Sequence, residues 1–272
     1  MILDERFKPF IYGSFAGAIG YIGTLPLDYI KQQVQTTNNL NILNNIKKNN
    51  FKTFFKGGII GSFSIIPQMA IKFSVNDYLS KKSHNNYFNG FIAGYIDGSF
   101  LGPILAIQSV LQHNKNYTYS SAFKMVLKNK FILPLTGPLA MRNAAYTSVM
   151  FGGRQSFGEF FESYDKITSG DFFESYDKIT SGDSNNYSFL KDLAISSALN
   201  VLGVIACSPF DVIRAKQINN IVEDKTVNPF YIAKDIYRIK GIKGFYQGVH
   251  VLYINFAIRF PLTFSLYLFL MN

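Results

Sequence analysis

The sequence contains few charged residues for its length. Asp, Glu, Lys and Arg make up 16% of its 272 residues, whereas an ordinary soluble domain has roughly 25%. Apolar residues make up 48% and aromatic residues 16%, from 27 Phe and 17 Tyr without any Trp. So few charges cannot comfortably cover a water-soluble globule, and the composition therefore indicates a membrane protein.

Cysteine and histidine are also scarce. The single cysteine, Cys207, excludes an intramolecular disulfide framework and any zinc site built on cysteine pairs. His84, His113 and His250 lie far apart without metal-ligand spacing. We therefore expect no metal and no other cofactor. The apolar segments also lack a nucleophile paired with a base, so we do not expect an enzyme.

The charged residues leave six largely uncharged stretches, at about 9–27, 57–76, 84–111, 131–153, 193–210 and 244–272. A helix rises 1.5 Å per residue, so about 20 residues cross a hydrocarbon core of about 30 Å. Each stretch is long enough or nearly so, and the sequence therefore predicts six transmembrane helices. The mean hydropathy of +0.09 is low for a bundle surrounded by lipid, which predicts helices that enclose water.

The second, fourth and sixth stretches each contain one basic residue: Lys72, Arg142 and Arg259. A cation at bilayer depth costs roughly 2.5–3.5 kcal/mol on insertion scales, so such residues generally face a polar cavity and serve the function. The alternative is that a residue near a span end, Lys72 above all, extends to the lipid headgroups.

The connections between the stretches differ in charge. Those at about 28–56, 104–130 and 210–247 carry 16 Lys and Arg with five acids, whereas the N-terminus and the other two connections carry 8 with eleven acids. This bias predicts an even number of spans with both termini on the less basic side. The Asn- and Lys-rich segment 36–50 lacks interleaved aromatic residues, so we expect no nucleic-acid partner.

The chain contains three copies of one hairpin, in repeats at 1–83, 84–186 and 187–272. The first, third and fifth stretches share small residues 13 and 9 positions before a proline. Small residues four apart let helices approach closely in lipid, and the proline predicts a kink. The aligned residues are Gly13, Gly17 and Pro26, then Gly90, Gly94 and Pro103, then Ser196, Asn200 and Pro209.

Residues around two of these prolines resemble the signature of the mitochondrial carriers, Pro-x-[Asp/Glu]-x-x-[Lys/Arg]. PLDYIK from Pro26 and PFDVIR from Pro209 match it fully, and KGIKGFYQG at 240–248 and FFKG at 54–57 resemble a family turn. The resemblance implies an all-α membrane protein with six transmembrane helices in a threefold pseudosymmetric barrel, with short matrix-side helices. It also implies a multi-pass antiporter of the mitochondrial inner membrane, which we expect to be a monomer with anionic lipid at its matrix side.

The second repeat departs from this signature, because Leu105 and Gln108 replace the acid and the base. In the family these positions form ion pairs that close the matrix side. Carried over by position, Asp211 still pairs with Lys31, Asp28 meets Gln108, and Arg214 faces Leu105. A single ion pair predicts weak closure and leakage toward uniport. The implied gate residues are Asp28, Lys31, Gln108, Asp211 and Arg214, with Gln35 and Gln112 in the bracing position.

In the family the substrate contacts lie at equivalent depths on the even helices. Aligning those helices on Phe73, Phe151 and Phe264 brings the three cations onto one stripe in each helix, since offsets of four and eight stay on one face. The implied substrate-binding residues are Ser64, Lys72, Arg142, Asn143, Tyr146, Asn255 and Arg259. Three converging cations predict a small anionic solute.

The residue pattern leaves the substrate open. Arg142 followed by Asn143 resembles family members for carboxylic or keto acids. Three cations exceed what a dicarboxylate needs, and Tyr146 could hold a base or simply pack, so the pattern slightly favours a nucleotide. A carrier-like scaffold that does not transport would also explain the eroded gate, although it leaves the three aligned cations without a purpose.

Residues 160–171, FFESYDKITSGD, are repeated without change at 172–183. Their Ser, Asp and Gly content is typical of an exposed loop, and we predict a loop without chemistry of its own between the fourth and fifth spans.

Overall fold

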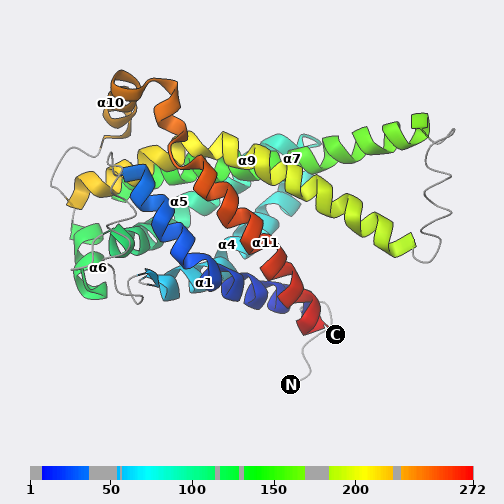
Figure 1. Cartoon of the computed structure of the whole chain (residues 1–272), viewed down its shortest axis with the longest axis horizontal. Coiled ribbons are helices and arrows are strands. Elements are labelled where there is room, and N and C mark those ends of the chain that lie inside the picture. Colours follow the sequence, from blue (N-terminus) through cyan, green and yellow to red (C-terminus); the bar gives the residue numbers. More distant parts are fainter. Residues whose placement is uncertain are drawn as a thin grey trace.

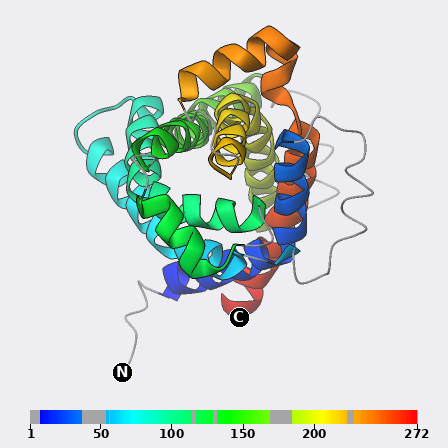
Figure 2. The same ribbon diagram turned by 90° about the vertical axis from the view of Figure 1, so that its left-hand side faces the viewer.

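Six long helices form the body of the protein. The computed structural model describes residues 8–36, 54–55, 57–113, 117–128, 132–168, 184–222 and 228–271. Each long helix contacts the next along the chain, and the last returns to the first. Figure 2 shows these helices arranged in a ring. They are α1 (Lys8–Thr36), α4 (Gly58–Ser80), α5 (Asn86–His113), α7 (Ile132–Thr168), α9 (Ser184–Val222) and α11 (Val249–Met271).

Each predicted span lies within one of these helices, apart from residues at its ends. Within the described residues, three segments are long and apolar enough to cross a membrane by length and composition: Gly58–Ser80, Asn86–Gln112 and Ile195–Ile221. The last span begins later than predicted. The short 3₁₀ helix η2 (Ile242–Tyr246) and Gly248, with a φ of 82°, come before α11.

Shorter helices lie at one end of the ring, where Figure 1 shows α6 (Tyr119–Lys128) and α10 (Pro229–Lys240). The sequence around α10 explains both of its ends. The Asn228 side chain accepts a hydrogen bond from the Phe230 amide, and Pro229 occupies the first turn, where its missing N–H costs nothing. Gly241, with a φ of 61°, ends the helix. The matching segment of the first repeat, 37–53, lies outside the described residues.

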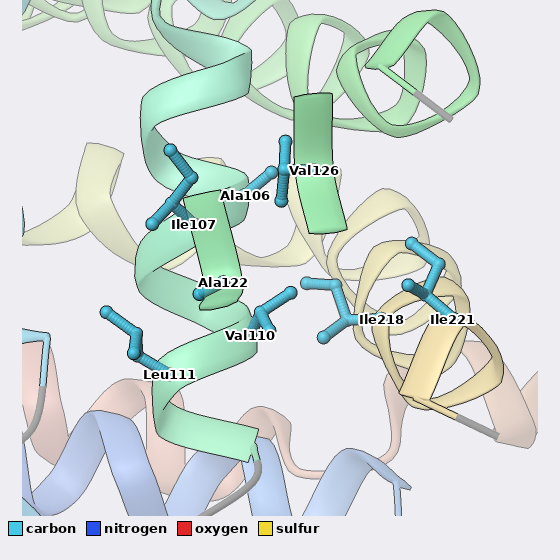
Figure 3. Packing of buried hydrophobic residues seen from close by; sticks show 8 residues of the cluster. All are labelled: Ala106, Ile107, Val110, Leu111, Ala122, Val126, Ile218 and Ile221. Carbon is cyan, nitrogen blue, oxygen red and sulfur yellow. The ribbon is translucent and has the colours of Figure 1, made fainter. Parts of the chain in front are cut away.

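The largest hydrophobic cluster joins three helices at this same end. Figure 3 shows Ala106, Ile107, Val110 and Leu111 of α5 beside Ala122 and Val126 of α6, with Ile218 of α9 next to Val110 and Ile221 farther along α9. All of these residues are buried, and Ala122 is 0% exposed. The apolar packing therefore lies beside the end of the ring, where it fastens the second repeat to the third.

The predicted small-residue stripe of α5 lies directly against α7. A Cβ atom at Gly94 would fall 2.3 Å from the carbonyl oxygen of Asn143, and one at Gly98 would fall 2.5 Å from the Cα of Ala140. Only glycine allows the two backbones to approach this closely. Pro26, Pro103 and Pro209 lie inside α1, α5 and α9, as expected, and Figure 1 shows α1 changing direction along its length.

The duplicated segment is not simply a loop. Residues 160–168 of the first copy continue α7, and the helix of α9 already begins at Ser184. Figure 1 shows these two helices extending beyond the rest of the ring. Residues 169–183, which include the second copy, lie outside the described residues. The loop prediction is therefore wrong for 160–168, because the helical hydrogen-bonding pattern of α7 continues through residues of turn-like composition.

Candidate functional site

The long helices enclose a cavity of about 400 Å³ to which all six contribute residues. This volume lies within the range of small-molecule sites. The predicted substrate residues that line the cavity are Ser64, Lys72, Arg142, Asn143, Tyr146 and Arg259. Asn255 does not line it: it is 1% exposed, and its amide donates to Asp28 at 2.9 Å, so it supports a charged neighbour.

Arg142 on α7 forms an ion pair with an acid of a neighbouring helix. Its Nε lies 2.7 Å from Asp211 Oδ1 on α9, and its Nη1 donates to Asn143 Oδ1 at 3.0 Å. Asp211 is 3% exposed at its side chain, whereas that of Arg142 is 25% exposed. The guanidinium therefore remains accessible from the cavity while the acid is covered.

Arg259 on α11 is fixed by three residues of α1. Its Nη2 lies 2.7 Å from Asp28 Oδ2, and its Nε donates to Thr24 Oγ1 at 2.8 Å. The guanidinium also lies 4.9 Å from the centroid of the Tyr21 ring, close enough for a cation–π interaction. These contacts hold Arg259 at the cavity wall, so the headgroup alternative does not apply to it.

Lys72 on α4 is paired with a residue that the sequence analysis missed. Its Nζ lies 3.2 Å from Asp97 Oδ2 on α5, and the Asn143 amide donates to the same oxygen at 2.8 Å. Asp97 is 0% exposed. The alternative in which Lys72 extends to the lipid headgroups is therefore wrong, because its ammonium group is paired with a buried carboxylate inside the ring.

A signal for Asp97 was present in the sequence. It is an acid inside an apolar stretch, and it stands six residues before Pro103, where the other two repeats have Gly20 and Gly203 before their prolines. An acid that replaces two aligned glycines needs a partner in a bilayer. Lys72, on the preceding span, is that partner.

All three even-helix cations are paired with acids, a feature that the sequence analysis did not predict for any of them. Each even-helix cation meets an acid of an odd helix: Lys72 meets Asp97, Arg142 meets Asp211, and Arg259 meets Asp28. The cavity lining contains five basic residues, namely Lys31, Lys72, Arg142, Arg214 and Arg259. Three acids accompany them, so the excess is two positive charges rather than a larger number.

Two of the predicted gate contacts are present. Lys31 Nζ lies 2.8 Å from Asp211 Oδ2. Arg214 faces Leu105, as expected, and its Nη2 donates to the backbone carbonyl of that residue at 2.9 Å and to Ser109 Oγ at 2.7 Å. The neutral partners around Arg214 thus take the place of the missing acid.

The predicted meeting of Asp28 with Gln108 is wrong. Gln108 donates to the Tyr21 hydroxyl, whereas Asp28 binds Arg259 and Asn255. A full positive charge is a stronger partner for a carboxylate than a neutral amide, which explains the difference.

The two bracing glutamines are both buried in α1 and α5. Gln112 accepts a hydrogen bond from Gln32, so it connects the two helices. Gln35 is 3% exposed and lies beneath Gly248, where a Cβ would fall 3.2 Å from its Cγ.

Tyr146 is engaged at both its ring and its hydroxyl group. The hydroxyl donates to Asn200 Oδ1 at 2.5 Å, and the ring stacks on Phe256 with centroids 5.8 Å apart and planes 17° apart. These contacts cover one face of the ring. They favour a packing role over that of a platform for a nucleotide base.

Comparisons with known proteins agree with the geometry. A family model described as mitochondrial carrier protein matches residues 5–87 and 185–272. The glutamate/glycine mitochondrial carrier ymc1 of Schizosaccharomyces pombe is 23% identical over 97% of this chain and 94% of its own length. The mitochondrial adenyl nucleotide antiporter SLC25A24 of Danio rerio is 23% identical over 89% of this chain. Mitochondrial substrate carrier family protein C of Dictyostelium discoideum is 23% identical over 94% of it. The chain spans 53% and 56% of those two longer proteins.

Proposed function

Because the chain belongs to the mitochondrial carrier family, and is thus a multi-pass transporter of the mitochondrial inner membrane, we propose that it moves a small carboxylate-bearing metabolite by alternating access. The observation that carries this proposal is the convergence of Lys72, Arg142 and Arg259 on one cavity from three even-numbered helices. Cations at this depth attract and hold an anion in transit. The reaction needs no covalent chemistry.

The charge around the cavity favours a carboxylate over a nucleotide. The lining cations exceed the accompanying acids by two, which suits one or two carboxylate groups better than a polyphosphate. The neighbouring Arg142 and Asn143 can bind a carboxylate with a guanidinium and an amide. The preference for a carboxylate reverses the slight preference for a nucleotide that the sequence alone favoured.

A nucleotide is the second candidate. It is favoured by the relative named as an adenyl nucleotide antiporter, although the relative named as a glutamate/glycine carrier is equally 23% identical. A nucleotide would need Tyr146 to leave Phe256 or to offer its other face. The two candidates differ in the solute that enters liposomes.

The contacts of Arg142 and Arg259 suggest how binding is coupled to opening. Both arginines line the cavity and also hold Asp211 and Asp28, the acids of the implied matrix gate. An anion that binds the arginines competes with these acids and weakens the contacts that close the matrix end. The empty carrier would then stay closed, which favours antiport over leakage toward uniport.

Uptake into liposomes tests the proposed function. The purified protein should take up labelled carboxylates, and it should be compared with labelled nucleotides, phosphate and amino acids at equal concentration. Counter-substrate inside the liposomes should accelerate uptake if exchange is the mode. Uptake of nucleotides alone would make the second candidate correct, and no uptake of any solute by inserted protein would favour the scaffold alternative.

A further inference from the structure

The acids that pair with the cavity cations are not equivalent, and Asp211 has a second cation. It lies within 2.7 Å of Arg142 and within 2.8 Å of Lys31. If Arg142 turns toward a solute, Asp211 therefore keeps a positive partner. The loss of one contact leaves no unpaired buried charge at this acid.

Asp28 has a different form of compensation. Its side chain is 16% exposed and lines the cavity, so water reaches it if Arg259 moves away. Asn255 also continues to donate to it. Desolvation therefore does not penalise this acid heavily when its cation is lost.

Asp97 has neither form of compensation. It is 0% exposed, and its contacts with described residues are the Lys72 ammonium and the Asn143 amide, both on Oδ2. Its Oδ1 is buried and has no hydrogen-bond partner among the described residues. If a solute took Lys72 away, Asp97 would remain charged and buried without a cation in direct contact, since Arg142 reaches it only through Asn143, and such a state is strongly unfavourable.

From this asymmetry we propose that the pair of Lys72 and Asp97 recognises the ammonium group of the substrate, so that the transported solute is an amino acid. The ammonium group of the solute takes the place of the Lys72 ammonium against Asp97, and it reaches this acid through the cavity that Lys72 lines. The released Lys72 binds the carboxylate of the same solute. One zwitterion thus replaces one ion pair and leaves no buried charge unpaired.

The neighbouring residues place the two recognition groups side by side. Asn143 accepts from Arg142 at 3.0 Å and donates to Asp97 at 2.8 Å, so one side chain links the arginine to the acid. The α-carboxylate and α-ammonium groups of an amino acid are attached to the same carbon atom. Arg142 is therefore held near Asp97 and can bind the same carboxylate as Lys72 while Asp97 binds the ammonium group.

The internal repeats show that this acid is not part of the shared framework. Gly20 and Gly203 stand at the corresponding positions of the first and third repeats. A Cβ at Gly20 would fall 2.1 Å from Thr263 Oγ1 on α11. The second repeat has a charged pair at a position where the first has close packing, so the pair serves something other than folding of the common barrel.

This inference rests on the proposed transport of a carboxylate, and paired solutes separate the two. Aspartate and malate differ only in an ammonium group against a hydroxyl group on one carbon, and so do alanine and lactate. Initial uptake into liposomes should favour the amino acid of the preferred pair by at least about tenfold, because a site built for a polar group rejects an analogue that lacks it. The same amino acid should raise the melting temperature of the detergent-solubilised protein more than its hydroxy acid does.

The double variant Lys72→Met with Asp97→Asn removes both charges together, so it leaves no lone buried charge. The preference for the amino acid should then fall to about twofold or less. The matched control is Lys81→Met with Asp77→Asn, which removes an exposed pair of the same two residue types, 2.8 Å apart, at the C-terminal end of α4. The control should keep the preference.

Other outcomes overturn the inference. Equal uptake of hydroxy acids and amino acids by the unmodified protein would overturn the inference and leave a carboxylate carrier. Malate uptake accompanied by a proton that neutralises Asp97 would have the same consequence. Uptake of nucleotides with none of the four acids would overturn both the inference and the carboxylate proposal. If the double variant fails to insert, equal thermal shifts with aspartate and malate, and with alanine and lactate, would be sufficient to reject the inference.

Discussion

The second repeat carries its odd-helix acid at a different depth from the other two repeats. Asp28 and Asp211 follow their prolines by two residues, whereas Asp97 precedes Pro103 by six residues. The first two belong to the implied gate, while the third is buried beside the substrate residues. Each repeat has nevertheless kept one acid for one even-helix cation, so the cavity stays nearly balanced in charge although the gate has lost an acid.

The largest expected effect comes from removing the cation that is paired with Asp97. Lys72→Ala should lower the free energy of unfolding by about 3–5 kcal/mol, because it strands a buried carboxylate. Thermal unfolding of the detergent-solubilised protein measures this loss. Adding Asp97→Asn to the same chain should recover most of the stability. If Lys72→Ala alone unfolds like the unmodified protein, Asp97 does not depend on Lys72.

The next effect concerns the arginines of the other two pairs. Arg142→Ala or Arg259→Ala should reduce uptake by about 30-fold or more, because each removes a charged partner from the solute and from an acid. Arg→Lys at either position should recover only part of the uptake, since a lysine lacks the planar fork of the guanidinium. Insertion of each variant, measured by its yield in purified membranes, is the control. Normal uptake by both Ala variants would show that the cavity selects its solute by other residues.

Restoring an acid to the second signature should have a smaller effect. Arg214 donates to the backbone carbonyl of Leu105. Leu105→Asp would give this arginine a carboxylate partner and should slow turnover by about fivefold. Leu105→Asn is the matched control, because it has a similar shape without the charge. Adding Gln108→Lys should slow opening further. Unchanged exchange rates in both variants would mean that this position does not limit opening.

The smallest effect is expected outside the ring. Deleting residues 160–171 should change uptake by no more than about twofold, since residues 160–168 lie beyond the cavity-lining part of α7 and the sequence of the segment is duplicated. The level of inserted protein provides the control. A large loss of uptake at a normal level of protein would assign the segment a part in transport.

The helical ring and much of the cavity could be predicted from the sequence because they depend on patterns of spacing. Uncharged stretches of one membrane thickness identified the helices, and the resemblance to the carrier signature implied the contact of Lys31 with Asp211. The pairing of Arg142 with Asp211 could not be predicted in this way, since it depends on how far a long side chain reaches between helices. Asp97 was overlooked because a single acid does not interrupt an apolar stretch noticeably.

The glycines of α5 have a mechanical consequence. Where Gly94 and Gly98 bring two backbones into contact, a helix cannot slide or rotate against its neighbour without a steric clash. We therefore expect α5 and α7 to move together as one rigid body during each transport cycle. Displacement must then concentrate where helices meet through side chains and not through backbone. The seam between α1 and α4 is of this kind, since a Cβ at Gly17 would meet the Ile65 side chain at 3.5 Å and one at Gly61 would meet the Tyr21 ring at 2.4 Å.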